Sequence, residues 1–173
     1  MSGLAQPSAA YAGDRGDPDP EVRDLLAVAG QSRNDYLRAV AALCTARFLL
    51  PIVAVGDGGS DGPDPDQHAE MRAVLVTAAD GRAGLPVFTG LDALTSWKPD
   101  ARPVLCRLDE VAATAVEAGA VAVLVDLAGP SPLVIEDSLV AQLADARRLV
   151  ELDDGGWGWL YSQPDSSPDG SAG

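Results

Sequence analysis

The stretch GAVAVLVDLAGPSPLVI, residues 119–135, contains the strongest strand signal of the chain. Its apolar run over residues 120–125 is the pattern of a central strand that is buried on both faces of a sheet. A Gly-Pro pair then indicates a turn, and a short second strand is expected at residues 133–135. Upstream of this stretch, apolar residues recur at helical spacing as far as Gly119, which favours a helix end. The segment therefore predicts helix, strand, turn and strand, in that order.

Four further apolar segments are expected to be strands, at residues 48–55, 71–77, 85–89 and 102–107. An Asp-Gly pair at residues 80–81 is a strong turn signal, so the strands on either side of it are expected to form an antiparallel hairpin. Thr89 and Asp92 have the spacing of a capping box, which predicts that Thr89 begins a short helix. Longer helices are expected at residues 108–116 and 139–150, because their apolar residues share one helical face.

Two helix-start signals stand near the N-terminus. Asp19 with Pro20 can begin one helix, and Ser32 with Asp35 can begin a second, which predicts a helical hairpin. Both chain ends are rich in Gly, Pro, Ser and Asp, which favours disorder. The fold class is therefore α+β, a single domain with a mixed, largely antiparallel sheet packed against helices. The expected parts are a disordered tail at 1–18, the helical hairpin at 19–46, the α+β domain at 47–150 and an acidic, aromatic-containing tail at 151–173.

A second block, LPVFTGLDALTSWKPDARPV at residues 85–104, precedes the first. Together the pieces LP-F-T, a nearby tryptophan, RPV and VLVD-AGP-PLVI resemble the SseB N-terminal-domain family, named after the enhanced-serine-sensitivity protein. The resemblance covers residues 48–146 and implies an α+β fold. The family carries no established catalytic residues, so the resemblance implies none in this chain. Abundant alanine, with Lys98 as the only lysine, indicates a bacterial member from a GC-rich genome.

Charge and composition exclude several classes of function. The formal net charge is −14, from 26 acidic against 12 basic residues, and it repels nucleic-acid phosphates and anionic membrane surfaces. No apolar run reaches the roughly 18 residues of a membrane-spanning helix. No signal-peptide pattern is present, and Cys44 and Cys106 lack metal-ligand spacing. We therefore expect a cytoplasmic protein with no nucleic-acid or membrane partner.

The segment GDGGSDGPDPDQHAE, residues 56–70, gathers four aspartates and the only histidine of the chain. An EF-hand loop beginning at Asp57 would need an oxygen ligand at its third position and a glutamate at its twelfth, where Gly59 and His68 stand. A phosphate-binding loop would need a lysine, and this segment has none. We interpret the segment as a solvated connector between two strands. A weak surface site for a hard cation is the alternative.

Few side chains are candidates for catalysis. His68 would have to be recruited from the acidic segment, and Cys44 and Cys106 fall in a helix and a strand, where cysteine behaves as a small apolar residue. Asp126 follows the strongest strand and has two interpretations: it caps a turn by bonding the backbone, which we favour, or it acts in catalysis. No glycine-rich stretch follows the dinucleotide-binding pattern. The sequence therefore favours a protein without catalytic, cofactor-binding or metal-binding residues.

Five aromatic residues are candidates for contact with a protein partner. Phe88 and Trp97 flank a strand-to-helix turn and form either a docking patch or, as we favour, part of the core. Trp157, Trp159 and Tyr161 stand in the acidic segment GGWGWLY at residues 155–161. They form either a recognition motif for a basic partner or a strand that folds back onto the domain.

The sequence is compatible with three functions. The leading one is a non-enzymatic domain for protein–protein interaction or regulation. The second is a hydrolase or transferase that uses Asp126, which a deep pocket with polar groups around this residue would favour. The third is an acidic factor whose tail binds a basic surface on its partner.

Overall fold

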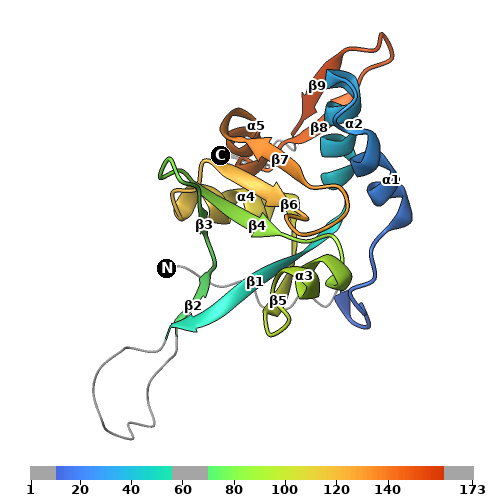
Figure 1. Cartoon of the computed structure of the whole chain (residues 1–173). Coiled ribbons are helices and arrows are strands. Elements are labelled where there is room, and N and C mark those ends of the chain that lie inside the picture. Colours follow the sequence, from blue (N-terminus) through green and yellow to red (C-terminus); the bar gives the residue numbers. More distant parts are fainter. Residues whose placement is uncertain (1–10, 56–69, 162–173) are drawn as a thin grey trace, which may run out of the picture.

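The computed structural model describes residues 11–55 and 70–161. Its helices are α1 (Pro20–Val28), α2 (Arg33–Leu43), α3 (Leu91–Trp97), α4 (Leu108–Glu117) and α5 (Asp137–Ala144) (Figure 1). Its strands are β1 (Arg47–Val55), β2 (Glu70–Ala73), β3 (Val76–Thr77), β4 (Ala83–Val87), β5 (Arg102–Arg107), β6 (Ala122–Val125), β7 (Leu133–Glu136), β8 (Arg148–Glu151) and β9 (Trp157–Leu160). The predicted α+β class and the N-terminal helical hairpin are confirmed.

The strands form three hydrogen-bonded groups, in the orders β2-β1-β5, β3-β4-β6-β7 and β8-β9. β4 and β6 are parallel, and the other pairs of neighbouring strands are antiparallel. Leu49 and Phe88 join the first two groups, because the backbone N–H of each donates to the carbonyl of the other, at 2.8 and 3.0 Å. The predicted sheet, mixed and largely antiparallel, is therefore confirmed.

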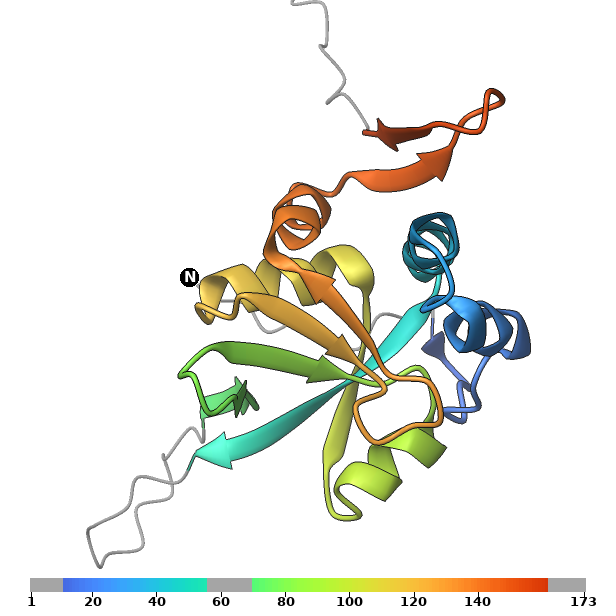
Figure 2. The ribbon, with the colours of Figure 1, turned by 45° about the horizontal axis from the view of Figure 1, so that its top comes forward.

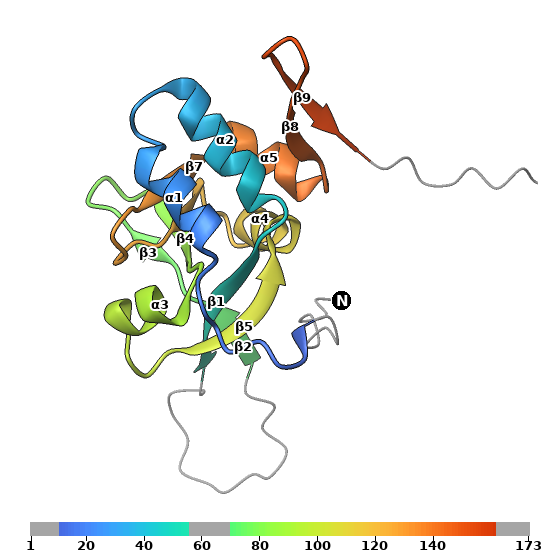
Figure 3. The same ribbon diagram turned by 90° about the vertical axis from the view of Figure 1, so that its right-hand side faces the viewer.

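Helices α4 and α5 cover one face of the β4-β6-β7 sheet (Figure 2). The core between them is apolar: Val111 of α4, Val123 of β6 and Ile135 of β7 have no exposed surface. Burying each such side chain stabilises the fold by roughly 1.5–3 kcal/mol. Helices α1 and α2 pack on each other beside this core, and α2 also contacts β8 (Figure 3).

The segment at residues 71–77 forms two strands where one was expected. β2 pairs with β1, whereas β3 pairs with β4, so the chain passes from one sheet to the next at Val74. The predicted β3–β4 hairpin is confirmed, with Gly81 at φ +84° in its turn. Thr89 does not cap α3, because Gly90 stands at that position and the Thr89 hydroxyl is bonded elsewhere.

The helix expected at residues 139–150 ends early. α5 stops at Ala144, and Ala146 has φ +58°, a left-handed conformation that no α-helix can include. Arg148 then begins β8, which pairs with β9. The segment that was expected to be a tail from residue 151 therefore contains, up to residue 161, the end of β8 and the whole of β9, which form an antiparallel hairpin.

The disorder expected for residues 1–18 does not hold for residues 11–18. Asp14 accepts two bonds from the Arg47 guanidinium, at 2.6 and 2.9 Å, and Leu91 donates its N–H to the Gly16 carbonyl at 2.7 Å. This segment, which we call the N-terminal strap (residues 11–18), is therefore tied to β1 and to the start of α3. Residues 1–10, 56–69 and 162–173, with the acidic segment around His68, lie outside the described residues.

Candidate interaction site

Asp126 lies in the loop after β6 and is 1% exposed. Its Oδ1 accepts the backbone N–H of Thr89 at 2.7 Å, and its Oδ2 accepts the Thr89 hydroxyl at 2.6 Å. Its own backbone has φ +49°, and its carbonyl accepts the N–H of Gly129 at 2.7 Å. Asp126 thus holds two loops together, the one before α3 and the one after β6.

Arg23 of α1 completes this network. Its Nε donates to the Thr89 hydroxyl at 2.8 Å and lies 3.3 Å from Oδ2 of Asp126, while its terminal nitrogens bond the Asp92 carboxylate at 2.8 and 3.1 Å. Burial raises the pKa of Asp126, although the bonds from Thr89 and the charge of Arg23 act in the opposite direction. The bonds from Arg23 lower the pKa of Asp92.

This geometry gives Asp126 a structural role. Both carboxylate oxygens accept bonds from Thr89, so the side chain does bond a backbone N–H, but that N–H belongs to the loop before α3 and not to the turn after Asp126. A cavity of about 580 Å³ lies beside the network and is lined by Thr89 and Arg47, but Asp126 does not line it. A hydrolase or transferase that used Asp126 would need a pocket with polar groups around this residue. This cavity is not such a pocket.

The candidate residues Phe88 and Trp97 pack against each other. Their ring centroids are 5.4 Å apart, and Phe88 has no exposed surface. They belong to a small cluster under α3 with Leu49 and Leu94. As placed, Phe88 cannot touch a partner, and only the half-buried Trp97 retains some accessible surface.

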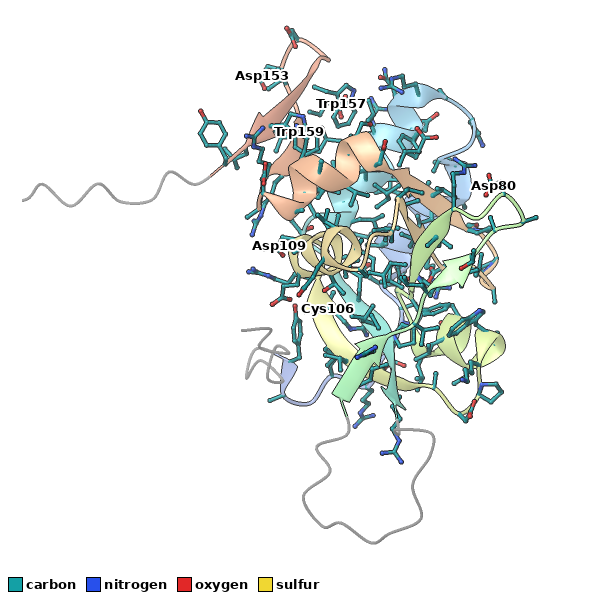
Figure 4. The ribbon with its side chains drawn as sticks, turned by 90° about the vertical axis from the view of Figure 1, so that its left-hand side faces the viewer. Asp80, Cys106, Asp109, Asp153, Trp157 and Trp159 are labelled. Atoms are coloured by element: carbon teal, nitrogen blue, oxygen red, sulfur yellow. The ribbon has the colours of Figure 1, made fainter. Side chains whose placement is uncertain are left out.

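Trp157 and Trp159 lie on the inner face of the β8–β9 hairpin and pack partly against the main core (Figure 4). The indole Nε1 of Trp157 donates to Oδ1 of Asn34 on α2 at 3.3 Å. Glu151 of β8 accepts two bonds from Arg38 of α2, at 3.0 and 3.2 Å. Trp157 and Glu151 therefore anchor the hairpin to α2, and Trp159 adds packing against the core, as the interpretation of a strand that folds back predicts.

Other apolar side chains of the hairpin remain exposed. Leu152, Leu160 and Tyr161 are 45%, 59% and 62% exposed. Tyr161 is thus the only one of the three predicted tail aromatics that is mostly accessible. Leu152 and Leu160 were not singled out from the sequence, although the two-residue period of a strand places Leu160 opposite the tryptophans.

The outer edge of the hairpin belongs to β9, which lies on the far side of β8 from the domain (Figure 2). The Leu152 N–H donates to the Gly156 carbonyl at 2.8 Å, and the register pairs Val150 with Gly158. Because hydrogen-bonded and non-hydrogen-bonded pairs alternate in an antiparallel ladder, Gly158 directs its backbone groups toward β8. Trp157 and Trp159 therefore direct theirs outward. We call the outward backbone groups of these two residues the β9 edge.

The two cysteines have unreactive surroundings. Burial raises the pKa of Cys106 to about 12, and it also raises the pKa of Cys44. Across residues 11–55 and 70–161, no group of three or more His, Cys, Asp and Glu side chains is placed to hold a metal ion. No helix in the same part of the chain is long and apolar enough to cross a membrane.

The fold and this surface together define an α+β domain with a parallel strand pair at its centre, two covering helices and an appended hairpin. The family model of the SseB protein N-terminal domain matches residues 22–142, and the chain belongs to this family. No curated protein and no solved structure gives a significant match. The matched region contains the Arg23–Thr89–Asp126 network, whereas the β8–β9 hairpin follows it.

Proposed function

We propose that this protein is a non-enzymatic, cytoplasmic interaction domain whose partner binds at the outer side of the β8–β9 hairpin. The observation that supports this proposal is the β9 edge, whose backbone N–H and C=O groups point away from the domain beside exposed Leu160 and Tyr161. A strand edge of this kind is a template for another extended chain. Free thiols at Cys44 and Cys106 are consistent with a reducing compartment.

The chemistry of the hairpin favours a basic partner. Asp153 and Asp154 form its exposed turn, and the whole chain carries a net charge of −14. Complementary charge speeds the encounter of two proteins and selects among partners. We therefore assign the partner an extended segment that alternates basic residues with apolar ones. The apolar residues would cover Leu160, and the basic ones would lie near the turn.

The experiment compares the full chain with two charge-reversal variants. Asp153→Lys changes the exposed turn of the hairpin, and Asp100→Lys makes the same change in the exposed turn after α3. Each protein is immobilised and used to capture partners from the cells that make it, at low and moderate salt. We expect one partner to be retained by the wild type and by Asp100→Lys, and to be lost with Asp153→Lys.

Hydrogen exchange of the captured complex then tests the mode of binding. A strand added at the β9 edge would bond the N–H groups of Trp157 and Trp159, so their exchange should slow by at least about tenfold. The N–H of Gly158, which faces β8, serves as the internal control. A partner that binds both variants equally, or that protects neither tryptophan amide, would show that this surface is not the binding site.

A further inference from the structure

A groove lies on the side of the molecule where α2 and α5 end and α4 begins. Its volume is about 310 Å³, within the range of small-molecule sites. Its lining includes Arg107, Asp109, Arg147, Arg148 and Leu160. The cavity of about 580 Å³ beside the Asp126 network shares Cys44, Arg107 and Arg148 with it, so the two hollows adjoin.

The lining of this groove is basic, whereas the chain as a whole is acidic. The protein has 12 basic residues and a net charge of −14, yet three of the nine residues that line the groove are arginines. Asp109 is the one carboxylate in its lining, and it lies at the start of α4 (Figure 4). Asp145 and Glu110 stand close by, one 4.0 Å from Arg147 and the other bonded to the backbone of Arg107.

Among residues 11–55 and 70–161, most of the donors of these arginines have no side-chain partner. Arg107 bonds Asp109 through one terminal nitrogen at 2.7 Å, and Arg147 bonds the side-chain oxygen of Gln142. Arg148 is exposed and makes no hydrogen bond or ion pair with another described side chain. Because each guanidinium carries five N–H donors, the groove can offer several charge-assisted bonds to one acceptor group.

The backbone that presents two of these arginines is strained. Ala146 has φ +58°, and within the described ranges Asp126 is the only other non-glycine residue with a positive φ. A left-handed conformation is sterically unfavourable for alanine, and such strain concentrates at functional sites. At Asp126 the strain serves the buried network. At Ala146 it turns the chain from α5 into β8 and places Arg147 and Arg148 at the groove.

From this geometry we propose that the groove binds a small organic phosphate monoester. Its dianion is held by Arg107, Arg147 and Arg148, and its apolar part lies against Leu160. Three guanidiniums favour a dianion over a singly charged carboxylate, and the planar arginine fork matches phosphate oxygens. This site adjoins the partner surface proposed above and shares Leu160 with it, but the arginines that bind the phosphate stand at the foot of the hairpin and not on the β9 edge.

The test titrates phenyl phosphate, inorganic phosphate and phenyl sulfate into the full chain, followed by calorimetry and by amide chemical shifts. We expect saturable binding of phenyl phosphate, with shifts at Arg107, Arg148 and Leu160. Inorganic phosphate lacks the apolar part and phenyl sulfate lacks the second charge, so both should bind more weakly. Arg148→Gln should weaken phenyl phosphate binding at least about fivefold, since one charge-assisted bond is lost.

The matched control is Arg82→Gln. Arg82 is exposed in the β3–β4 turn, where it pairs with Asp80, and the same charge is removed there. The affinity of the Arg82→Gln variant for phenyl phosphate should equal that of the wild type. Both arginines are exposed, so neither variant should lose its fold, which the melting temperature checks. No saturation up to about 10 mM phenyl phosphate, or equal weakening in both variants, would overturn the proposal.

Discussion

Asp126 accepts two hydrogen bonds from Thr89, one from the backbone N–H at 2.7 Å and one from the hydroxyl at 2.6 Å. The two residues stand 37 positions apart in the sequence. Their contact fixes the loop that leads into α3 against the loop that follows β6. Since Arg23 of α1 bonds the same hydroxyl, a single carboxylate ties the N-terminal hairpin to the sheet.

Asp126→Asn should destabilise the fold by about 2 kcal/mol. An amide can replace only one of the two acceptor oxygens, so a buried donor of Thr89 or Arg23 is left without its charged acceptor. Urea denaturation followed by tryptophan fluorescence measures the free energy of unfolding. Asp24→Asn is the control, because Asp24 is exposed on α1. Equal stability of the two variants would refute the structural role of Asp126.

Asp14→Asn should release the N-terminal strap. The Arg47 guanidinium and the Gly16 N–H both bond the Asp14 carboxylate, and the strap in turn accepts the N–H of Leu91. Hydrogen exchange at Leu91 should therefore become several-fold faster, while exchange in α4 is unchanged. Unchanged exchange at Leu91 would mean that the strap is held by other contacts.

Stability should fall on acidification. The bonds from Arg47 and Arg23 lower the pKa of Asp14 and of Asp92 below the ordinary 3.8. A lowered folded-state pKa means that the unfolded chain binds more protons, so the stabilisation is full above pH 3.8 and is lost as the pH falls through the folded-state pKa values. Asp126, whose pKa is raised by burial, works in the opposite direction.

Denaturation at a series of pH values between about 5 and 2 measures this dependence. The double variant Asp14→Asn with Asp92→Asn should show a flatter decline than the wild type, because two of the titrating groups are gone. An equally steep decline in the variant would assign the acid sensitivity to other carboxylates.

Ala146→Gly should stabilise the protein by about 1 kcal/mol, because glycine adopts a left-handed conformation without the steric cost that alanine bears. Ala141→Gly, in the exposed middle of α5, is the matched control and should destabilise by about the same amount. Thermal unfolding of both variants checks the sign. A loss of stability in Ala146→Gly would contradict the strain inferred at this turn.

Trp159→Ala should loosen the hairpin from the domain and destabilise the fold by about 2 kcal/mol, since the indole packs partly against the main core. Tyr161→Ala changes a side chain that is 62% exposed and should alter stability by less than about 0.5 kcal/mol. Limited proteolysis of the hairpin, compared between the two variants, measures the detachment directly. Equal cleavage rates would show that Trp159 is not an anchor.

Much of the fold follows from local patterns in the sequence. The helical period of α4, the apolar run of β6 and the turn at Gly81 each predict their own element, because the pattern and the buried surface that it creates lie within a few residues. The predicted extent of the final helix is wrong because it, too, rests on local spacing alone. Residues 139–150 have helical spacing throughout, but pairing of β8 with β9 takes Arg148 out of the helix.

The candidate site is only partly predictable from the sequence. The aromatic residues of the hairpin are visible as a group, yet the structure separates them into the anchors Trp157 and Trp159 and the exposed Tyr161. The arginines of the groove give no local signal at all. Arg107 and Arg148 come from distant parts of the chain and line one groove only because the end of β5 and the start of β8 lie on the same side of the domain.

The α+β class, the family and most of the elements can be predicted from the sequence, since they depend on spacing between near neighbours. The buried bonds of Asp126, the outward backbone groups of β9 and the three arginines that line one groove become visible only in the folded structure. Each of these features depends on contacts between residues far apart in the chain. Such contacts form when apolar surfaces pack, and packing of the whole core selects among the local alternatives that the sequence leaves open.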